Sequence, residues 1–159
     1  MNTAQFDLTK WYQLLALGGG SGLAKHAPGT FGTLAAVPLV ALLLWLGNIY
    51  LLAFVIVASL LGIYVCGKTA EDIGEHDHKA IVWDEVTGFA ITMLWVPLHW
   101  QTLLLGFVLF RLFDIVKPWP ISVLDKHVHG GLGIMLDDIA AGGLALLLLH
   151  LSLPFLPLV

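Results

Sequence analysis

Charged residues are scarce in this chain. They make up 11 % of its 159 residues, against roughly 25 % in an ordinary soluble domain. The few basic residues form no stripe and the net charge is −4, so the composition does not indicate nucleic-acid binding. Cys66 is the only cysteine, which excludes a disulfide within the chain. The length fits one domain, residues 1–159.

Long hydrophobic runs are the main feature of the remaining sequence. A charge-free stretch of 33 residues is divided by a Gly-Asn pair into segments 34–46 and 49–66. Residues 86–110 carry no Asp, Glu, Lys or Arg and are interrupted at 97–100, and residues 139–159 form the last apolar run. Turn-forming residues between apolar segments favour helical hairpins in a membrane. The sequence therefore predicts an all-α fold, a polytopic membrane helical bundle of two helical hairpins and a final crossing helix.

The other segments place the charges on one side of the membrane. Residues 1–17 suggest a short interfacial helix at the N-terminus, and residues 68–79 a loop or a short solvated helix. If five segments cross, every Lys and Arg lies on the side of the N-terminus, which the positive-inside rule makes cytoplasmic. The same threading puts Trp45, Trp95 and Trp100 near the hairpin tips on the opposite side.

Two pairs of adjacent acids stand at the start of apolar segments, Asp84-Glu85 and Asp137-Asp138. Acids at a helix N-terminus are stabilised by the free amides and the helix dipole, so helix capping is one interpretation. One acid would be enough for capping. Two pairs on the same side of the membrane favour a Mg²⁺ site, because Mg²⁺ prefers carboxylate oxygens.

A mixed-charge segment lies between the two acid pairs. Asp114 is expected near the end of a helix, where a negative charge opposes the helix dipole. Arg111 precedes it by three residues and could form a structural ion pair with it. The alternative is functional: Arg111 and Lys117 bind a phosphate while Asp114 binds metal or water, since Arg and Lys are the usual phosphate partners.

Residues 18–33 are rich in glycine and lead into the first apolar segment. They could be a flexible linker, or their backbone amides could approach an anion with Lys25, Thr30 and Thr33 as further donors. Two His-x-His pairs, at 76–78 and 127–129, could be zinc ligands, but no third ligand stands at a matching spacing. We interpret these histidines as loop residues.

Four stretches of this sequence resemble the phosphatidylglycerophosphatase A family of small bacterial membrane phosphatases: residues 27–33, 81–88, 110–121 and 130–142. The resemblance implies an all-helical fold and Mg²⁺-dependent hydrolysis of phosphatidylglycerophosphate to phosphatidylglycerol and phosphate. It also implies a bacterial inner-membrane protein in which the active site faces the cytoplasm. The lipid and the bilayer are the expected partners, and the sequence does not indicate an oligomeric state.

On this interpretation the expected site has two parts. The metal-binding carboxylates are Asp84, Glu85, Asp114, Asp137 and Asp138, which hold one or two Mg²⁺ ions; together with Arg111 they form the catalytic set. The substrate-binding residues are Lys25, Thr30, Thr33, Arg111 and Lys117. Spacing leaves open whether water or an aspartate attacks phosphorus.

Two functions of other classes remain as alternatives. The first is an ion-coupled membrane transporter or channel that uses the carboxylates, although its charges would be expected nearer the middle of the bilayer. The second is a non-catalytic membrane scaffold, which leaves the two acid pairs unexplained.

Overall fold

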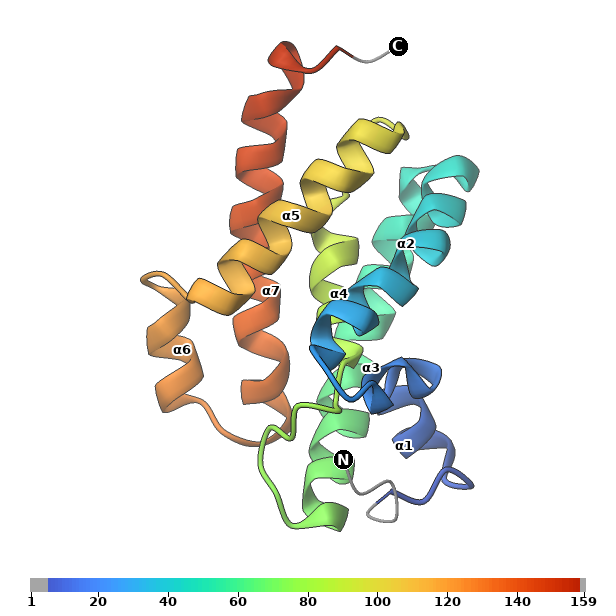
Figure 1. The fold of residues 1–159 in the computed structure, drawn as a ribbon, viewed down its shortest axis with the longest axis vertical. Coiled ribbons are helices and arrows are strands. Elements are labelled where there is room, and N and C mark those ends of the chain that lie inside the picture. The colour runs from blue at the N-terminus through green and yellow to red at the C-terminus, as the bar shows by residue number, and fades with distance from the viewer. Residues whose placement is uncertain (1–5, 158–159) are drawn as a thin grey trace.

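Helices account for all regular secondary structure in residues 6–157, the part of the chain that the computed structural model describes (Figure 1). The elements in chain order are α1 (Trp11–Ala16), the 3-10 turn η2 (Gly18–Leu23), α2 (Pro28–Leu46), α3 (Asn48–Ile73), α4 (Trp83–Thr92), α5 (Trp100–Val116), α6 (Ile121–His127), α7 (Gly130–Ser152) and the 3-10 turn η3 (Leu153–Phe155). The predicted all-α fold is confirmed.

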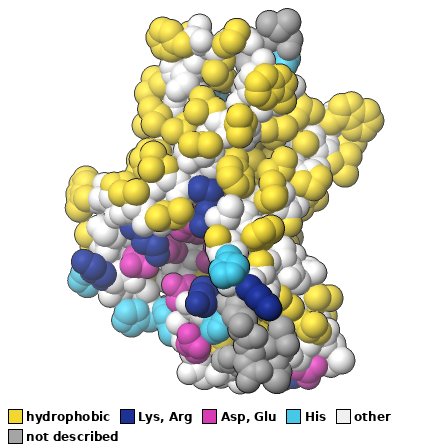
Figure 2. Space-filling model, viewed as in Figure 1, with side chains coloured by type: hydrophobic (Ala, Val, Ile, Leu, Met, Phe, Trp, Pro, Cys, Tyr) yellow, Lys and Arg dark blue, Asp and Glu magenta, His cyan; other side chains and the backbone are white. Residues whose placement is uncertain are grey.

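The first predicted hairpin is formed by α2 and α3. The chain reverses at Gly47, whose φ of 126° is open to glycine but strained for other residues. Within residues 6–157, three helices are long and apolar enough to cross a membrane: Pro28–Leu46, Asn48–Ile73 and the continuous run Gly130–Phe155. On the face drawn in Figure 2, hydrophobic side chains predominate at one end of the molecule. This surface and these helices give the chain the character of a membrane protein.

Two helix boundaries differ from the predictions. Residues 68–73 belong to α3, because Asp72 in its last turns accepts hydrogen bonds from Tyr12 and Gln13 and pairs with Lys10 at 2.9 Å. These contacts hold the six-residue helix α1 against the polar end of α3. Whether α1 also touches the membrane surface stays a prediction, and residues 1–5 lie outside the described part of the chain.

The last helix begins at Gly130, nine residues before the predicted start. Its first turn packs directly on α3, since a Cβ on Gly131 would lie 1.8 Å from the carbonyl oxygen of Ile63. Glycine is a poor helix former in isolation, so the run Gly130-Gly131 did not suggest a helix in the sequence. Here it is helical because only glycine permits this close crossing.

The second predicted hairpin has unequal arms. Helix α4 has ten residues and is about 15 Å long, which is too short to cross a bilayer core of ~30 Å. The prediction of five full crossings is therefore wrong for α4. The chain still reaches the far end of the molecule, because the N–H of Trp95 donates to Oδ1 of Asn48, 2.8 Å away at the tip of the first hairpin.

Helix α4 lies at the centre of the bundle, against α3 and α7 (Figure 1). Eight of its ten residues are buried. It crosses α7 closely, because a Cβ on Gly142 would lie only 2.4 Å from the carbonyl oxygen of Gly88. Gly88 follows Asp84 by one helical turn and Gly142 follows Asp138 by one turn, so this crossing also brings the two acid pairs together.

Candidate active site

The two acid pairs and the mixed-charge segment line one cavity of about 300 Å³. Charged side chains gather around this hollow below the apolar end of the molecule (Figure 2). Six acids and three bases contribute to the lining: Asp77, Asp84, Glu85, Asp114, Asp137, Asp138, Lys79, Arg111 and Lys117. The predicted convergence of distant chain regions is present in the structure.

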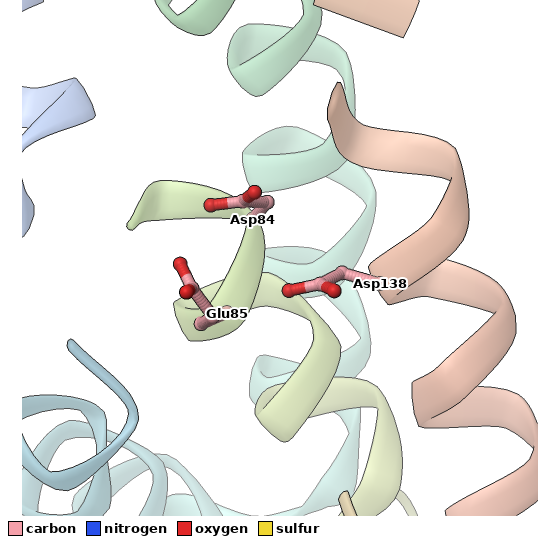
Figure 3. A group of neighbouring side chains, drawn as sticks. All are labelled: Asp84, Glu85 and Asp138. Carbon is pink, nitrogen blue, oxygen red and sulfur yellow. The ribbon is translucent and has the colours of Figure 1, made fainter. Parts of the chain in front are cut away.

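At the base of the cavity Asp84 and Glu85 of α4 meet Asp138 of α7, and these three form the acid cluster (Figure 3). Each offers a carboxylate oxygen, and these oxygens all lie within 4.8 Å of one another. Asp84 and Asp138 are only 7 % and 3 % exposed. Burial and the neighbouring carboxylate raise the pKa of Asp84, and burial likewise raises that of Glu85. A bound cation would favour the ionised forms.

The capping interpretation is compatible with the position of the α4 pair but not with that of the α7 pair. Asp84 and Glu85 do lie in the first turn of α4, although the helix start has no side-chain cap. Asp137 and Asp138 lie two turns inside α7, which starts at Gly130. The prediction that they open a helix is therefore wrong, because the glycine-rich stretch before them is itself helical. They cannot be N-terminal caps there.

Arg111 and Asp114 form the ion pair considered from the sequence. Nη1 of Arg111 lies 2.5 Å from Oδ2 of Asp114 and 3.7 Å from Oε1 of Glu85. Both partners of the close pair are largely buried and both line the cavity. The ion pair and a role at a phosphate are thus compatible, since the guanidinium has five donors.

Lys117 follows the end of α5 with a φ of 44°. Its Nζ lies 2.5 Å from Oδ1 of Asp125 on α6 and 2.6 Å from Oδ2 of Asp137 on α7. Burial alone would lower the pKa of Lys117, but the two carboxylates outweigh it and the pKa is raised. Asp125 was not identified from the sequence, because no spacing rule connects it to Asp137.

The glycine-rich segment contributes backbone to the cavity. Ala27, Pro28 and Gly29 line it, whereas the lining does not include Lys25, Thr30 or Thr33. The Thr33 hydroxyl is buried and donates to the carbonyl oxygen of Gly29 at 2.9 Å. A Cβ on Gly29 would lie 2.1 Å from Oε1 of Glu85, so this glycine gives the acid cluster its space.

Three of the four histidines of the two His-x-His pairs lie at hydrogen-bond distance from backbone groups. Nε2 of His76 accepts the N–H of Gly130, and Nδ1 of His78 accepts the N–H of Ala80. Nδ1 of His127 lies 2.8 Å from the carbonyl oxygen of Val123. Among residues 6–157 the acid cluster is the one group of three or more His, Cys, Asp or Glu side chains that could hold a metal.

The donors present fit Mg²⁺. Four buried carboxylate oxygens have no hydrogen-bond partner within the described chain: Oδ1 of Asp84, Oε2 of Glu85, Oδ1 of Asp137 and Oδ2 of Asp138. Leaving a buried charged oxygen unpaired is costly, and a hard cation that takes oxygen ligands would remove that cost. The acid cluster would hold the ion, with Asp137 and Asp114 beside it.

Comparison with known proteins places this site in a family. The sequence model of phosphatidylglycerophosphatase A matches residues 14–153. The chain is 48 % identical over 143 residues to phosphatidylglycerophosphatase A of Escherichia coli (strain K12), covering 87 % of this chain and 81 % of the relative. It is 51 % identical over 130 residues to the protein of that name from Haemophilus influenzae, covering 80 % of each.

A third relative has a different name. The chain is 34 % identical over 153 residues to a putative phosphatidylinositol-3-phosphatase of Bacteroides thetaiotaomicron, covering 87 % of this chain and 91 % of the relative. No solved structure matches the chain. The match of the family model over most of the length, together with these identities, shows that the chain belongs to the phosphatidylglycerophosphatase A family.

Proposed function

We propose that this protein hydrolyses the terminal phosphate monoester of phosphatidylglycerophosphate, giving phosphatidylglycerol and inorganic phosphate, with Mg²⁺ as cofactor. The observation that carries the proposal is the cavity, where a cluster of buried carboxylates with unpaired oxygens faces Arg111. Six acids against three bases would repel a phosphate dianion. The site therefore needs a cation before it can accept its substrate.

The chain's own residues have separate tasks in this reaction. The acid cluster and its neighbour Asp137 hold the cation, which supplies Lewis acidity toward the phosphoryl group when bound. Arg111 presents its guanidinium to the phosphoryl oxygens, where negative charge must be stabilised in the transition state. Asp114 fixes the orientation of Arg111 through their ion pair at 2.5 Å. Lys117, held by Asp125 and Asp137, adds positive charge at the same wall.

The fold suits a substrate that stays in a membrane. Apolar side chains cover the end of the molecule beyond the cavity (Figure 2), and three helices can cross the bilayer. The lipid tails can therefore remain among the helices while the phosphorylated headgroup enters the polar cavity. We propose that the cavity faces the cytoplasm of a bacterial cell from the inner membrane, since the Lys and Arg residues lie toward its side.

The direct test is phosphate release by the purified protein from phosphatidylglycerophosphate in mixed micelles. We expect turnover with Mg²⁺, none after EDTA treatment, and recovery when Mg²⁺ is added back. Turnover that persists in EDTA would refute the metal dependence. Absence of release with Mg²⁺ present would refute the activity itself.

The preference for one lipid headgroup over another is tested in the same assay. Phosphatidylinositol 3-phosphate is the matched comparison, because one relative carries that lipid in its name. We expect the larger kcat/KM on phosphatidylglycerophosphate, in accord with the two relatives of higher identity. The reverse preference would assign the chain to inositol lipids.

A further inference from the structure

Of the three bases that line the cavity, Lys79 alone forms no ion pair within residues 6–157. Arg111 is paired with Asp114 and Glu85, and Lys117 with Asp125 and Asp137. Lys79 lies within 4 Å of no carboxylate in residues 6–157 and makes no side-chain hydrogen bond there. It is a cation that lines the proposed phosphate site and has no ion-pair or hydrogen-bond partner in the described part of the chain.

The loop between α3 and α4 holds Lys79 at the cavity through contacts of its neighbours. Residues 77, 79 and 81 line the cavity. The two histidines that flank Asp77 anchor the loop: His76 accepts the N–H of Gly130 at 2.8 Å, His78 accepts that of Ala80 at 3.0 Å, and His78 packs edge-on against Phe6. The loop consists of turns, with Asp77 at a φ of 52° and the N–H of Ile81 donating to the carbonyl oxygen of His78 at 2.8 Å, and these contacts hold Lys79 in its place at the cavity.

The three bases differ in solvent exposure, which indicates how deep in the cavity each one lies. The side chain of Arg111 is 14 % exposed and that of Lys117 is 26 % exposed, whereas Lys79 is an exposed residue. Arg111 therefore stands at the enclosed part beside the acid cluster, and Lys79 stands at the mouth. A ligand that reaches the acid cluster with one end passes Lys79 with the other.

Phosphatidylglycerophosphate has two phosphates, a terminal monoester and the diester that joins the headgroup to the diacylglycerol. With the monoester at the acid cluster, the diester lies one glycerol unit further out, toward the mouth. We infer that Lys79 binds this diester and thereby selects lipids whose phosphate monoester is carried on a diester-linked headgroup. The inference rests on the proposed function and assigns Lys79 as the residue that binds the second phosphate.

The experiment measures the substitution Lys79→Ala with two lipids in the same mixed micelles. Phosphatidylglycerophosphate contains the diester, and phosphatidate, used as competing ligand, has a phosphate monoester but no diester. We expect KM for phosphatidylglycerophosphate to rise about tenfold, the scale of one lost charged hydrogen bond. We expect kcat and the inhibition constant of phosphatidate to stay unchanged. Lys79→Arg should restore KM because it keeps the positive charge.

Lys126 provides the matched control, because it is an exposed lysine that does not line the cavity. Lys126→Ala should leave both constants at wild-type values. If Lys79→Ala weakens the binding of both lipids equally, Lys79 lies at the scissile phosphate and the inference is overturned. It is also overturned if Lys79→Ala changes the binding of neither lipid. Wild-type protein that releases no phosphate from phosphatidylglycerophosphate refutes the proposed function instead, so the two failures are distinguishable.

Discussion

The acid pair of α4 and the acid pair of α7 face each other across one cavity, but their backbones differ. Asp84 and Glu85 stand in the first turn of α4, where backbone amides are free. Asp137 and Asp138 stand inside α7, where the amides are already bonded within the helix. Each pair nevertheless has one acid directed at a base, Glu85 toward Arg111 and Asp137 toward Lys117.

Within each pair the two acids have different surroundings. In each pair, the acid without a basic partner among residues 6–157, Asp84 or Asp138, is the more completely buried, and we propose that it holds the cation. The acid beside a base also positions that base. Helix capping cannot account for the α7 pair, which lies inside the helix where capping cannot occur.

The largest effect is expected when one acid of the α7 pair is replaced. Asp138→Asn should lower kcat by more than about 10³-fold, because it removes a charged ligand of the cation and leaves a buried amide in the acid cluster. Asp137→Asn should cost less, since Asp137 is the member bonded to Lys117. Kinetics and Mg²⁺ titration of both purified variants test this order. Equal activity of Asp138→Asn and wild type would contradict the metal site.

Arg111→Lys should have the next largest effect, because Arg111 is the base beside Glu85 of the α4 pair. Lysine keeps the charge but loses the planar fork that can serve Asp114 and a phosphoryl group together. We expect kcat to fall about 10²-fold with a smaller change in KM. Steady-state kinetics in mixed micelles measure both constants. If kcat remains at the wild-type value, Arg111 is only an ion-pair partner.

The spacing of the two pairs can be changed without touching either. Gly142→Ala places a Cβ against the carbonyl oxygen of Gly88 and should push α4 away from α7. We expect a loss of about 1–3 kcal/mol in the free energy of unfolding from overpacking, and an activity loss of about tenfold from misplaced carboxylates.

Gly143→Ala is the control for this change. It lies one residue further along α7, and a Cβ there would meet nothing within 4 Å. Alanine at this helical position should leave activity intact and slightly raise thermal stability, because alanine favours helix over glycine. Equal losses in both variants would show that the close crossing does not position the acids.

The smallest effect is expected from Asp125→Asn. Lys117 has two carboxylate partners, so loss of Asp125 leaves the contact to Asp137 at 2.6 Å. An exposed ion pair contributes only about 0–1 kcal/mol, and we expect KM to change less than about fivefold. A loss as large as that of Asp137→Asn would show that α6 is itself part of the site.

Parts of this architecture could be predicted because they depend on local sequence. The charge-free segments 34–46 and 49–66 and the Gly-Asn pair between them specify the first hairpin without reference to the rest of the chain. The gathering of Asp84, Arg111 and Asp138 could be predicted as well, because threading a few apolar segments brings their charged ends to one side.

Other parts depend on contacts that no local pattern carries. The early start of α7 follows from the contact of Gly131 with α3, whereas intrinsic propensity argues against a helix there. The roles of Asp125 and Lys79 follow from the chain path around the cavity. The loop before α4 is merely polar in the sequence, and only the folded chain shows that Asp77, Lys79 and Ile81 line the cavity.

The short length of α4 has a consequence for how this protein meets bilayers of different thickness. Hydrophobic mismatch acts on helices that span the hydrocarbon, which answer it by tilting. Helix α4 does not span and is enclosed by its neighbours, so it has no mismatch of its own. A change in lipid chain length is transmitted to Asp84 and Glu85 only through the crossing at Gly88 and Gly142. The outer helices can adapt to the membrane while the acids keep their spacing.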